Sequence, residues 1–166
     1  RISYAANKKL GGGVILTQIH EIDYFLQLFS DYKIKNATYI SSKISDLDID
    51  VEDIFSSNFL LKKNKNNMFC SINLNYFERP KKRKFYLIGN NGSLVACFNT
   101  QKIHIIKNGK EKILKFNFKK NDIFIKEIKF FISKVKSKKI ISKNLSLYNG
   151  IKTLRFALKL KNRFIK

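Results

Sequence analysis

The chain has 166 residues, of which 44% are hydrophobic and 13% aromatic, and its formal charge at pH 7 is +22. This length and hydrophobic content predict one globular domain and exclude a disordered chain. No apolar run approaches the roughly 20 residues that a transmembrane helix needs, and no secretory signal opens the sequence, so we expect a cytoplasmic protein without a membrane partner.

The positive charge is unevenly distributed and comes mainly from lysine. Residues 1–60 carry a net charge of −2 and residues 61–166 carry +24, and only 5 of the 34 basic residues are arginine. Proteins that read nucleic-acid bases depend on arginine, whose planar guanidinium pairs with guanine and phosphate. The lysine excess therefore favours a solvated surface without specific nucleic-acid binding, and a Lys-rich nucleic-acid-binding domain remains an alternative.

The first predicted element is a helix that follows a glycine triplet, from Gly11 to Phe29. Its apolar residues recur at intervals of three and four and predict one buried stripe: Ile15, Ile19, Ile22, Leu26 and Phe29. A second face of the same helix carries polar side chains: Thr17, His20, Tyr24 and Gln27. Glycines at the start of a helix can leave backbone N–H groups uncovered, so we expect that a ligand could approach closely here.

Strands are predicted to follow this helix, beginning with the alternating segment Lys33–Ser45. Three hairpins come next: Ile54–Lys62 with Met68–Tyr76, Lys84–Ile88 with Ser93–Asn99, and Lys102–Lys107 with Lys110–Phe118. Two further helices complete the chain, one from Asn121 to Ser137 and one from about Ser146. Their predicted buried faces are Phe124, Ile128, Phe131 and Val135 in the first, and Leu147, Ile151, Leu154 and Leu158 in the second.

This order of elements predicts an α+β fold with one broad, mostly antiparallel sheet of about six or seven strands. Helices would cover one face, and the other face would be available for oligomerisation. Several apolar strand residues exceed what the helices can cover and favour a homo-oligomer: Ile72, Leu74, Phe85, Leu87, Phe116 and Phe118. Cys70 and Cys97 belong to different strands and His104 is isolated, so neither a metal site nor a disulfide is predicted.

The segment GGGVILTQIHEIDYFLQLFSD at residues 11–31 resembles the one that opens the C-terminal domain of Gfo/Idh/MocA-type oxidoreductases, the glucose-fructose oxidoreductase and inositol dehydrogenase family. Four further segments occur in the family's order: DVED at 50–53, RPKKRKFYLIGNNGSLVACF at 79–98, NDIFIKEIKFFISKV at 121–135 and SLYNGIKTLRFALKL at 146–160. The resemblance therefore extends over essentially the whole chain. RISYAA before the glycines and RP…R before the glycine turn are most similar to the branch that acts on nucleotide sugars or acidic sugars for surface glycans.

The resemblance implies a two-domain enzyme. An N-terminal Rossmann domain would bind NAD or NADP, and residues 1–166 would form the C-terminal domain that supplies the substrate contacts and the oligomerisation sheet. The sequence contains no G-x-G-x-x-G motif after a strand, so we expect this chain alone to bind no dinucleotide. The implied reaction is oxidation or reduction of a sugar or nucleotide-sugar hydroxyl or carbonyl group.

His20 matches the family's catalytic histidine, which exchanges a proton with the substrate hydroxyl. Many relatives carry a carboxylate three or four residues earlier, where this sequence has Leu16 and Thr17. Asp23 is expected to anchor the helix. The expected substrate-binding residues are Thr17, Gln18, Tyr4 and Arg79. A second interpretation is a non-catalytic remnant that only oligomerises or binds a ligand.

Overall fold

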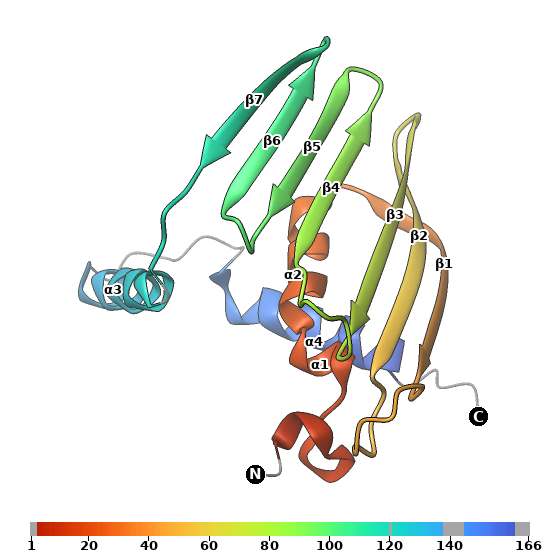
Figure 1. Ribbon diagram of the computed structural model, residues 1–166. Coiled ribbons are helices and arrows are strands. Elements are labelled where there is room, and N and C mark those ends of the chain that lie inside the picture. The colour runs from red at the N-terminus through yellow and green to blue at the C-terminus, as the bar shows by residue number, and fades with distance from the viewer. Residues whose placement is uncertain (1–2, 120, 138–144, 162–166) are drawn as a thin grey trace. The chain divides into compact units, whose positions relative to one another are not determined.

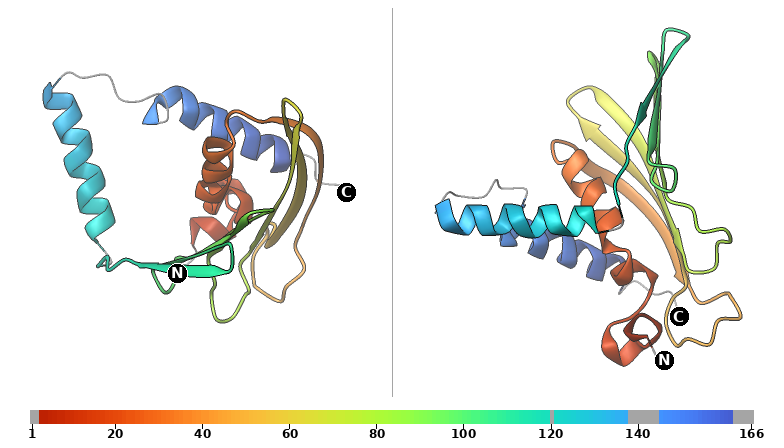
Figure 2. Two further views of the ribbon diagram at one scale, coloured as in Figure 1. Left: turned by 90° about the horizontal axis from the view of Figure 1, so that it is seen from above. Right: turned by 60° about the vertical axis from the view of Figure 1, so that its left-hand side comes forward.

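The computed structural model describes residues 3–119, 121–137 and 145–161, and the chain forms two compact units. The first unit comprises Arg1–Phe77 and Ile141–Lys166, and the second comprises Glu78–Ile140. Figures 1 and 2 show the helices and strands of each unit. No helix in the described ranges is long and apolar enough to cross a membrane.

The first unit is a three-stranded antiparallel sheet with helices against one face (Figure 1). Its elements are the 3-10 turns Tyr4–Ala6 and Lys8–Leu10, helices α1 (Val14–Thr17) and α2 (Ile19–Leu28), strands β1 (Lys33–Ser42), β2 (Ile54–Lys63) and β3 (Asn66–Asn75), and helix α4 (Leu147–Lys161). Strand β2 lies in the centre of the sheet, and α2 and α4 lie on the same side of it (Figure 2).

Every second side chain along β2 is buried in the core of this unit. Phe55, Phe59 and Leu61 point toward the helices and are at most 1% exposed, and the ring of Phe25 in α2 stacks on Phe59 with 4.8 Å between ring centroids. The predicted apolar stripe of the first helix is confirmed, since two of its members are fully buried and three pack against the core: Ile15 and Ile22, then Ile19, Leu26 and Phe29.

The prediction of one continuous helix from Gly11 to Phe29 is wrong. The helix is interrupted at Gln18, whose backbone angles (φ −108°, ψ 29°) depart from helical values. The Gln18 amide side chain donates to the carbonyl oxygen of Asn75 at 3.2 Å, which ties this position to the end of β3. A tight turn follows, in which the Glu21 N–H donates to the Gln18 carbonyl oxygen. The interruption divides the predicted helix into α1 and α2, and His20 belongs to α2.

The buried face of α4 also differs from the prediction. The expected residues are all at least 37% exposed: Leu147, Ile151, Leu154 and Leu158. Thr153, Ala157 and Leu160 are buried instead, and the ring of Phe156 stacks with that of Phe25. Two contacts set this rotation of α4 about its axis, the aromatic stack and a hydrogen bond from Thr153 to Asp23. Neither contact follows from hydrophobic spacing within α4.

The second unit is a four-stranded antiparallel meander followed by a helix. Its elements are β4 (Lys84–Gly89), β5 (Gly92–Cys97), β6 (Lys102–Lys107), β7 (Lys110–Lys115) and α3 (Asp122–Ser137). The predicted Asn108-Gly109 turn is confirmed, with φ of 50° and 73°, because these two residue types tolerate positive φ. No described residue of α3 is buried, so its predicted apolar face does not form a core: Phe124, Ile128, Phe131 and Val135 are at least 58% exposed.

The prediction of one broad sheet is wrong, although the class is α+β. The described strands form two separate sheets of three and four strands, because β3 pairs only with β2 and β4 only with β5. The segment between β3 and β4 is not a short turn, and Pro80 within it has no N–H to donate to a ladder. Ile72 and Leu74, expected on an open face, pack in the core of the first unit.

Candidate functional site

The glycine triplet is a tightly packed loop rather than an open cradle. The N–H groups of Gly11, Gly12 and Gly13 donate to the carbonyl oxygens of Lys8, Asn7 and Ala5 respectively. The expectation of uncovered N–H groups at this helix start is therefore wrong. The loop does not fit a dinucleotide phosphate, because the donors that would cradle it are already used within the chain.

Two of these glycines are required because neighbouring atoms leave no space for a side chain. A Cβ on Gly12 would lie 2.5 Å from the carbonyl oxygen of Ala5 and 2.6 Å from that of Tyr4. Gly13 has φ of +111°, and a Cβ there would overlap with the carboxylate of Glu52. The loop therefore holds the start of α1 in direct contact with the segment that precedes β2.

That segment carries two buried carboxylates, Glu52 and Asp53, which are 1% and 0% exposed. The ammonium of Lys161 at the end of α4 lies 3.5 Å from Glu52 Oε2 and also donates to the carbonyl oxygen of Gly12. Glu52 Oε1 has no hydrogen-bond partner among the described residues. The ion pair thus joins α4, the glycine loop and the segment before β2.

Asp53 organises the turn between β1 and β2. Its carboxylate accepts hydrogen bonds from the N–H groups of Ile44 and Ser45, both at 2.9 Å, and from the Ser45 hydroxyl at 2.5 Å. Burial by itself would raise the pKa of Asp53, but these hydrogen bonds outweigh burial and lower it. They also explain why β1 ends at Ser42 rather than at the predicted Ser45, since the next amides turn toward Asp53.

His20 lies in the first turn of α2 with 48% of its side chain exposed. Its Nε2 atom is 3.1 Å from Glu21 Oε1, and its ring meets that of Tyr24 edge to face with 6.5 Å between centroids. The carboxylate beside His20 thus comes from the following residue rather than from Leu16 or Thr17. Helical periodicity does not predict this pair, because adjacent residues normally point about 100° apart.

Thr17 is held by a hydrogen-bond chain to the end of β3. Its hydroxyl donates to the carbonyl oxygen of Gly13 at 2.9 Å, which leaves the Tyr76 hydroxyl as donor in the 2.5 Å contact between Tyr76 and Thr17. The Tyr76 hydroxyl also lies 3.4 Å from the Ala5 carbonyl oxygen. Partial burial raises the pKa of Tyr76, and the nearby Glu52 carboxylate adds to the rise, although the Thr17 contact opposes it. Tyr76 therefore remains a neutral hydroxyl.

The first unit contains four of the five expected site residues: Tyr4, Thr17, Gln18 and His20. Tyr4 is 62% exposed, in the turn that precedes the glycine loop. Arg79 belongs to the second unit, where its Nη1 donates to the Glu78 carbonyl oxygen at 3.0 Å. Asp23 anchors α2 as predicted, because the Thr153 hydroxyl donates to it at 2.7 Å.

Glu21 and Tyr76 are the candidate site residues that sequence reasoning missed. Tyr76 ends the second predicted hairpin, and its position opposite Thr17 depends on how β3 runs alongside α1. Glu21 follows His20 directly in α2, and helical spacing gave no signal for this pair because adjacent helical residues do not normally face each other.

Comparison with known proteins identifies the fold. No family model matches the sequence, and no curated protein matches it. Solved structures do match. A proposed oxidoreductase from Thermotoga maritima superposes with a TM-score of 0.73 at 18% identity, covering 98% of this chain and 48% of that chain. UDP-N-acetylglucosamine 3-dehydrogenase GnnA from Acidithiobacillus ferrooxidans superposes with a TM-score of 0.73 at 16% identity, covering 91% of this chain and 47% of that chain.

A third match is biliverdin reductase from Synechocystis, whose structure contains biliverdin and NADP+. Its TM-score is 0.67 at 12% identity, and the match covers 98% of this chain and 50% of that chain. The chain thus spans about half the length of the structures it matches. The fold implied by the resemblance to Gfo/Idh/MocA-type oxidoreductases is confirmed, and over nearly its whole length this chain has the fold of about half of such an oxidoreductase.

Proposed function

We propose that this chain is the substrate-binding half of an NAD(P)-dependent oxidoreductase that acts on a hydroxyl or carbonyl group of a sugar or nucleotide sugar. The observation that carries the proposal is the position of His20, a half-exposed imidazole beside a carboxylate on α2 of this fold. GnnA, which shares the fold, is named for dehydrogenation of a nucleotide sugar. That name supports the choice of substrate class.

The chemistry assigned to this chain is proton transfer. Oxidation of an alcohol removes a hydride from carbon and a proton from oxygen, and His20 would hold that proton. The Glu21 carboxylate, 3.1 Å away, would stabilise the positive charge that the imidazole gains and would restrict its orientation. Glu21 would therefore replace the carboxylate that relatives carry one turn earlier.

The nicotinamide cofactor would accept the hydride and would be bound by a different part of the protein. The glycine loop at residues 11–13 cannot hold its phosphates, because its N–H groups are hydrogen-bonded within the chain. Purified as residues 1–166, the chain should leave NADH fluorescence unchanged on titration. Micromolar affinity would contradict this division of roles.

Substrate hydroxyl groups would meet polar side chains that precede His20 in the chain and that lie at the end of β3. Thr17 and Gln18 are held by hydrogen bonds to the backbone oxygens of Gly13 and Asn75, and the Tyr76 hydroxyl donates to Thr17, so their positions are fixed before a ligand binds. Sugar recognition needs such prepositioned donors and acceptors, because each unpaired hydroxyl in the bound state costs free energy. Tyr4 remains the proposed outer contact within the first unit.

The decisive experiment compares His20→Ala, Glu21→Gln and the control His104→Ala in the complete protein, with UDP-N-acetylglucosamine and NAD+ or NADP+ as the first substrates. Loss of the proton acceptor in His20→Ala should lower kcat by about 10²–10⁴-fold. The melting temperature should be unchanged, because nearly half of the His20 side chain is exposed. Glu21→Gln should lower kcat by a smaller factor than His20→Ala. His104 lies in β6 beside Glu111, and the control His104→Ala should leave kcat unchanged.

If no sugar or nucleotide sugar is turned over, or if His20→Ala reacts at the unaltered rate, the catalytic assignment is wrong and the chain is a non-catalytic module. Specific binding of one DNA or RNA sequence that persists at about 200 mM salt would instead favour the nucleic-acid alternative.

We also propose that two copies associate through the outer face of the β1–β3 sheet, the face away from α2 and α4. Its central residues are Asn36, Thr38, Ile40, Ser56, Asn58, Leu60, Phe69, Ser71 and Asn73. None of these described residues is charged, although 28% of the chain is, and interface centres are depleted in charge. Two hydrogen bonds, Ser56 to Asn73 and Ser71 to Asn58, keep this face ordered.

Light scattering tests the proposed association. Asn58→Lys places a charge at the centre of the outer face and should convert a dimer to a monomer. Asn67→Lys adds the same charge at the edge of the sheet and should leave the dimer intact. A monomer in the unaltered protein, or a dimer that survives Asn58→Lys, would rule out this face.

A further inference from the structure

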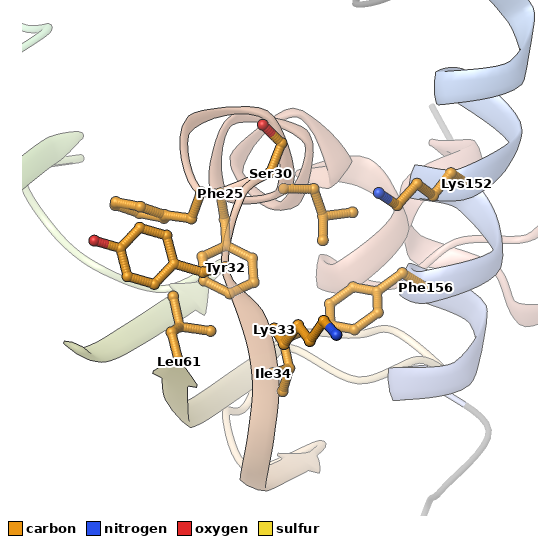
Figure 3. A pocket seen from close by; sticks show the side chains of 10 residues that line it. Phe25, Ser30, Tyr32, Lys33, Ile34, Leu61, Lys152 and Phe156 are labelled. Carbon is orange, nitrogen blue, oxygen red and sulfur yellow. The ribbon is translucent and has the colours of Figure 1, made fainter. Parts of the chain in front are cut away.

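A cavity of about 350 Å³ lies in the first unit between the end of α2, the start of β1 and α4 (Figure 3). This volume is within the range of roughly 300–1,000 Å³ that is usual for small-molecule sites. None of its lining residues belongs to the candidate site around His20. The cavity is therefore a separate feature that the proposed oxidoreductase activity does not use.

Four of the ten residues that line the cavity are aromatic: Phe25, Phe29, Tyr32 and Phe156. Phe25 and Phe156 stack with ring centroids 6.4 Å apart, Phe25 meets Phe29 edge to face at 5.9 Å, and Phe29 meets Tyr32 edge to face at 6.2 Å. Phe25 is 6% exposed and belongs to the core, so this wall is fixed by the packing of the unit. A rigid aromatic wall favours a ligand with an apolar body, because that body leaves water without reorganising the protein.

Two lysines from different elements give the cavity its charge. Figure 3 shows Lys33 extending from the start of β1 and Lys152 from α4, with the ring of Phe156 also in the wall. None of the described lining residues is acidic. The neighbouring carboxylate, Asp31, is paired with Lys63 at 2.8 Å and so is engaged away from these lysines. The two ammonium groups would favour an anion at the cavity.

We propose that this cavity binds a small amphipathic anion, a molecule with one carboxylate and an apolar chain or ring. The apolar body would lie against Phe25, Phe29 and Phe156, and the carboxylate would meet the ammonium groups of Lys33 and Lys152. The two requirements are independent, because the aromatic wall selects apolar bodies of any charge and the lysines select anions. Together they exclude bare phosphate, sugars and apolar cations as ligands.

Isothermal titration calorimetry with decanoate as the probe tests the proposal. Decyltrimethylammonium supplies the same chain with the opposite charge, and inorganic phosphate supplies charge without a chain. We expect saturable binding of decanoate with one site per chain, and at least tenfold weaker binding of both controls. Equal binding of decanoate and decyltrimethylammonium would show a non-specific apolar surface and would overturn the proposal.

Variants locate the site. Lys33→Gln with Lys152→Gln removes both cavity charges and should weaken decanoate binding by roughly tenfold, the combined effect of two partly solvated ion pairs. Lys35→Gln with Lys159→Gln removes the same net charge from the same two elements outside the cavity and should have no effect. Identical affinities in the two double variants would overturn the proposal.

Ser30→Trp is the second test, because Ser30 is an exposed lining residue whose replacement fills the cavity without removing core contacts or charge. Decanoate binding should be lost while the melting temperature stays the same. If Ser30→Trp instead dissociates a dimer and decanoate does not bind the unaltered protein, the cavity is a protein interface and the proposal is wrong. Because none of these readouts uses enzyme activity, failure here leaves the assignment of His20 unaffected.

Discussion

Replacing glycines of the first unit by alanine gives a sharp test of the packing around the glycine loop. Three glycines differ in backbone conformation and surroundings. Gly11 has φ of +77° and no atom within 4 Å of the point where a Cβ would lie, whereas Gly13 has φ of +111° beside Glu52. Gly150 is helical with open space around it. One chemical change, the addition of a methyl group, therefore meets three different environments in one compact unit.

The expected effects on the free energy of unfolding differ in size and sign. Gly11→Ala should destabilise by about 1–2 kcal/mol, the cost of a left-handed conformation for alanine. Gly13→Ala adds a collision with a carboxylate that is 1% exposed and paired with Lys161 at 3.5 Å, so it should cost at least about 3 kcal/mol. Gly150→Ala should stabilise by about 0.5–1 kcal/mol, because alanine loses less backbone entropy in a helix.

Urea unfolding followed by far-ultraviolet circular dichroism measures these differences. At a typical slope of about 2 kcal/mol per M, Gly13→Ala should lower the midpoint by about 1.5 M, Gly11→Ala by about 0.5–1 M, and Gly150→Ala should raise it slightly. Equal effects of Gly11→Ala and Gly13→Ala would refute the reasoning, since they would mean that the Glu52 carboxylate does not lie against Gly13.

Three further predictions concern charge. Hydrogen bonds hold the pKa of Asp53 below its ordinary value of 3.8 in the folded protein, so its contribution to stability is present above about pH 4 and is lost as the pH falls through the folded pKa. Asp53→Asn should therefore lower the free energy of unfolding by about 1–3 kcal/mol at pH 7. In urea unfolding, the variant should lose less stability than the unaltered protein as the pH falls. Lys161→Met should lower the free energy of unfolding by about 3–5 kcal/mol, because it leaves Glu52 buried without its partner. Lys159→Met, on the exposed side of α4, should lower it by less than about 0.5 kcal/mol in the same assay. The charge of +22 should give DNA binding that is independent of sequence and is lost near about 200 mM salt in a filter-binding assay, and retention at that salt would contradict a solvated lysine surface.

Sequence patterns were sufficient to predict the elements that are determined by residues close together in the chain. The apolar residues of the first helix predicted its buried stripe, because Ile15 and Ile22 face the core wherever that helix packs. The Asn108-Gly109 turn was predictable because few other dipeptides tolerate two positive φ values. The resemblance of residues 11–31 to a known segment placed His20 in a helix, and His20 lies in α2.

The arrangement of these elements depended on contacts between residues far apart in the chain. The sequence indicated strands but not that β3 and β4 belong to different sheets, because pairing is decided by which edges meet in space. The orientation of α4 was mispredicted, since Thr153 binds Asp23 across 130 positions and overrides the more hydrophobic face of the helix.

The same limit applies to the candidate site. The resemblance pointed to His20, Thr17 and Gln18, but it did not show that Thr17 meets Tyr76 or that Gln18 binds Asn75 at the end of β3. The chain alone therefore determined which side chains could do chemistry. Tertiary structure decided which of them meet, because a hydrogen bond or an ion pair requires atoms within about 3–4 Å, and only packing of distant segments brings them that close.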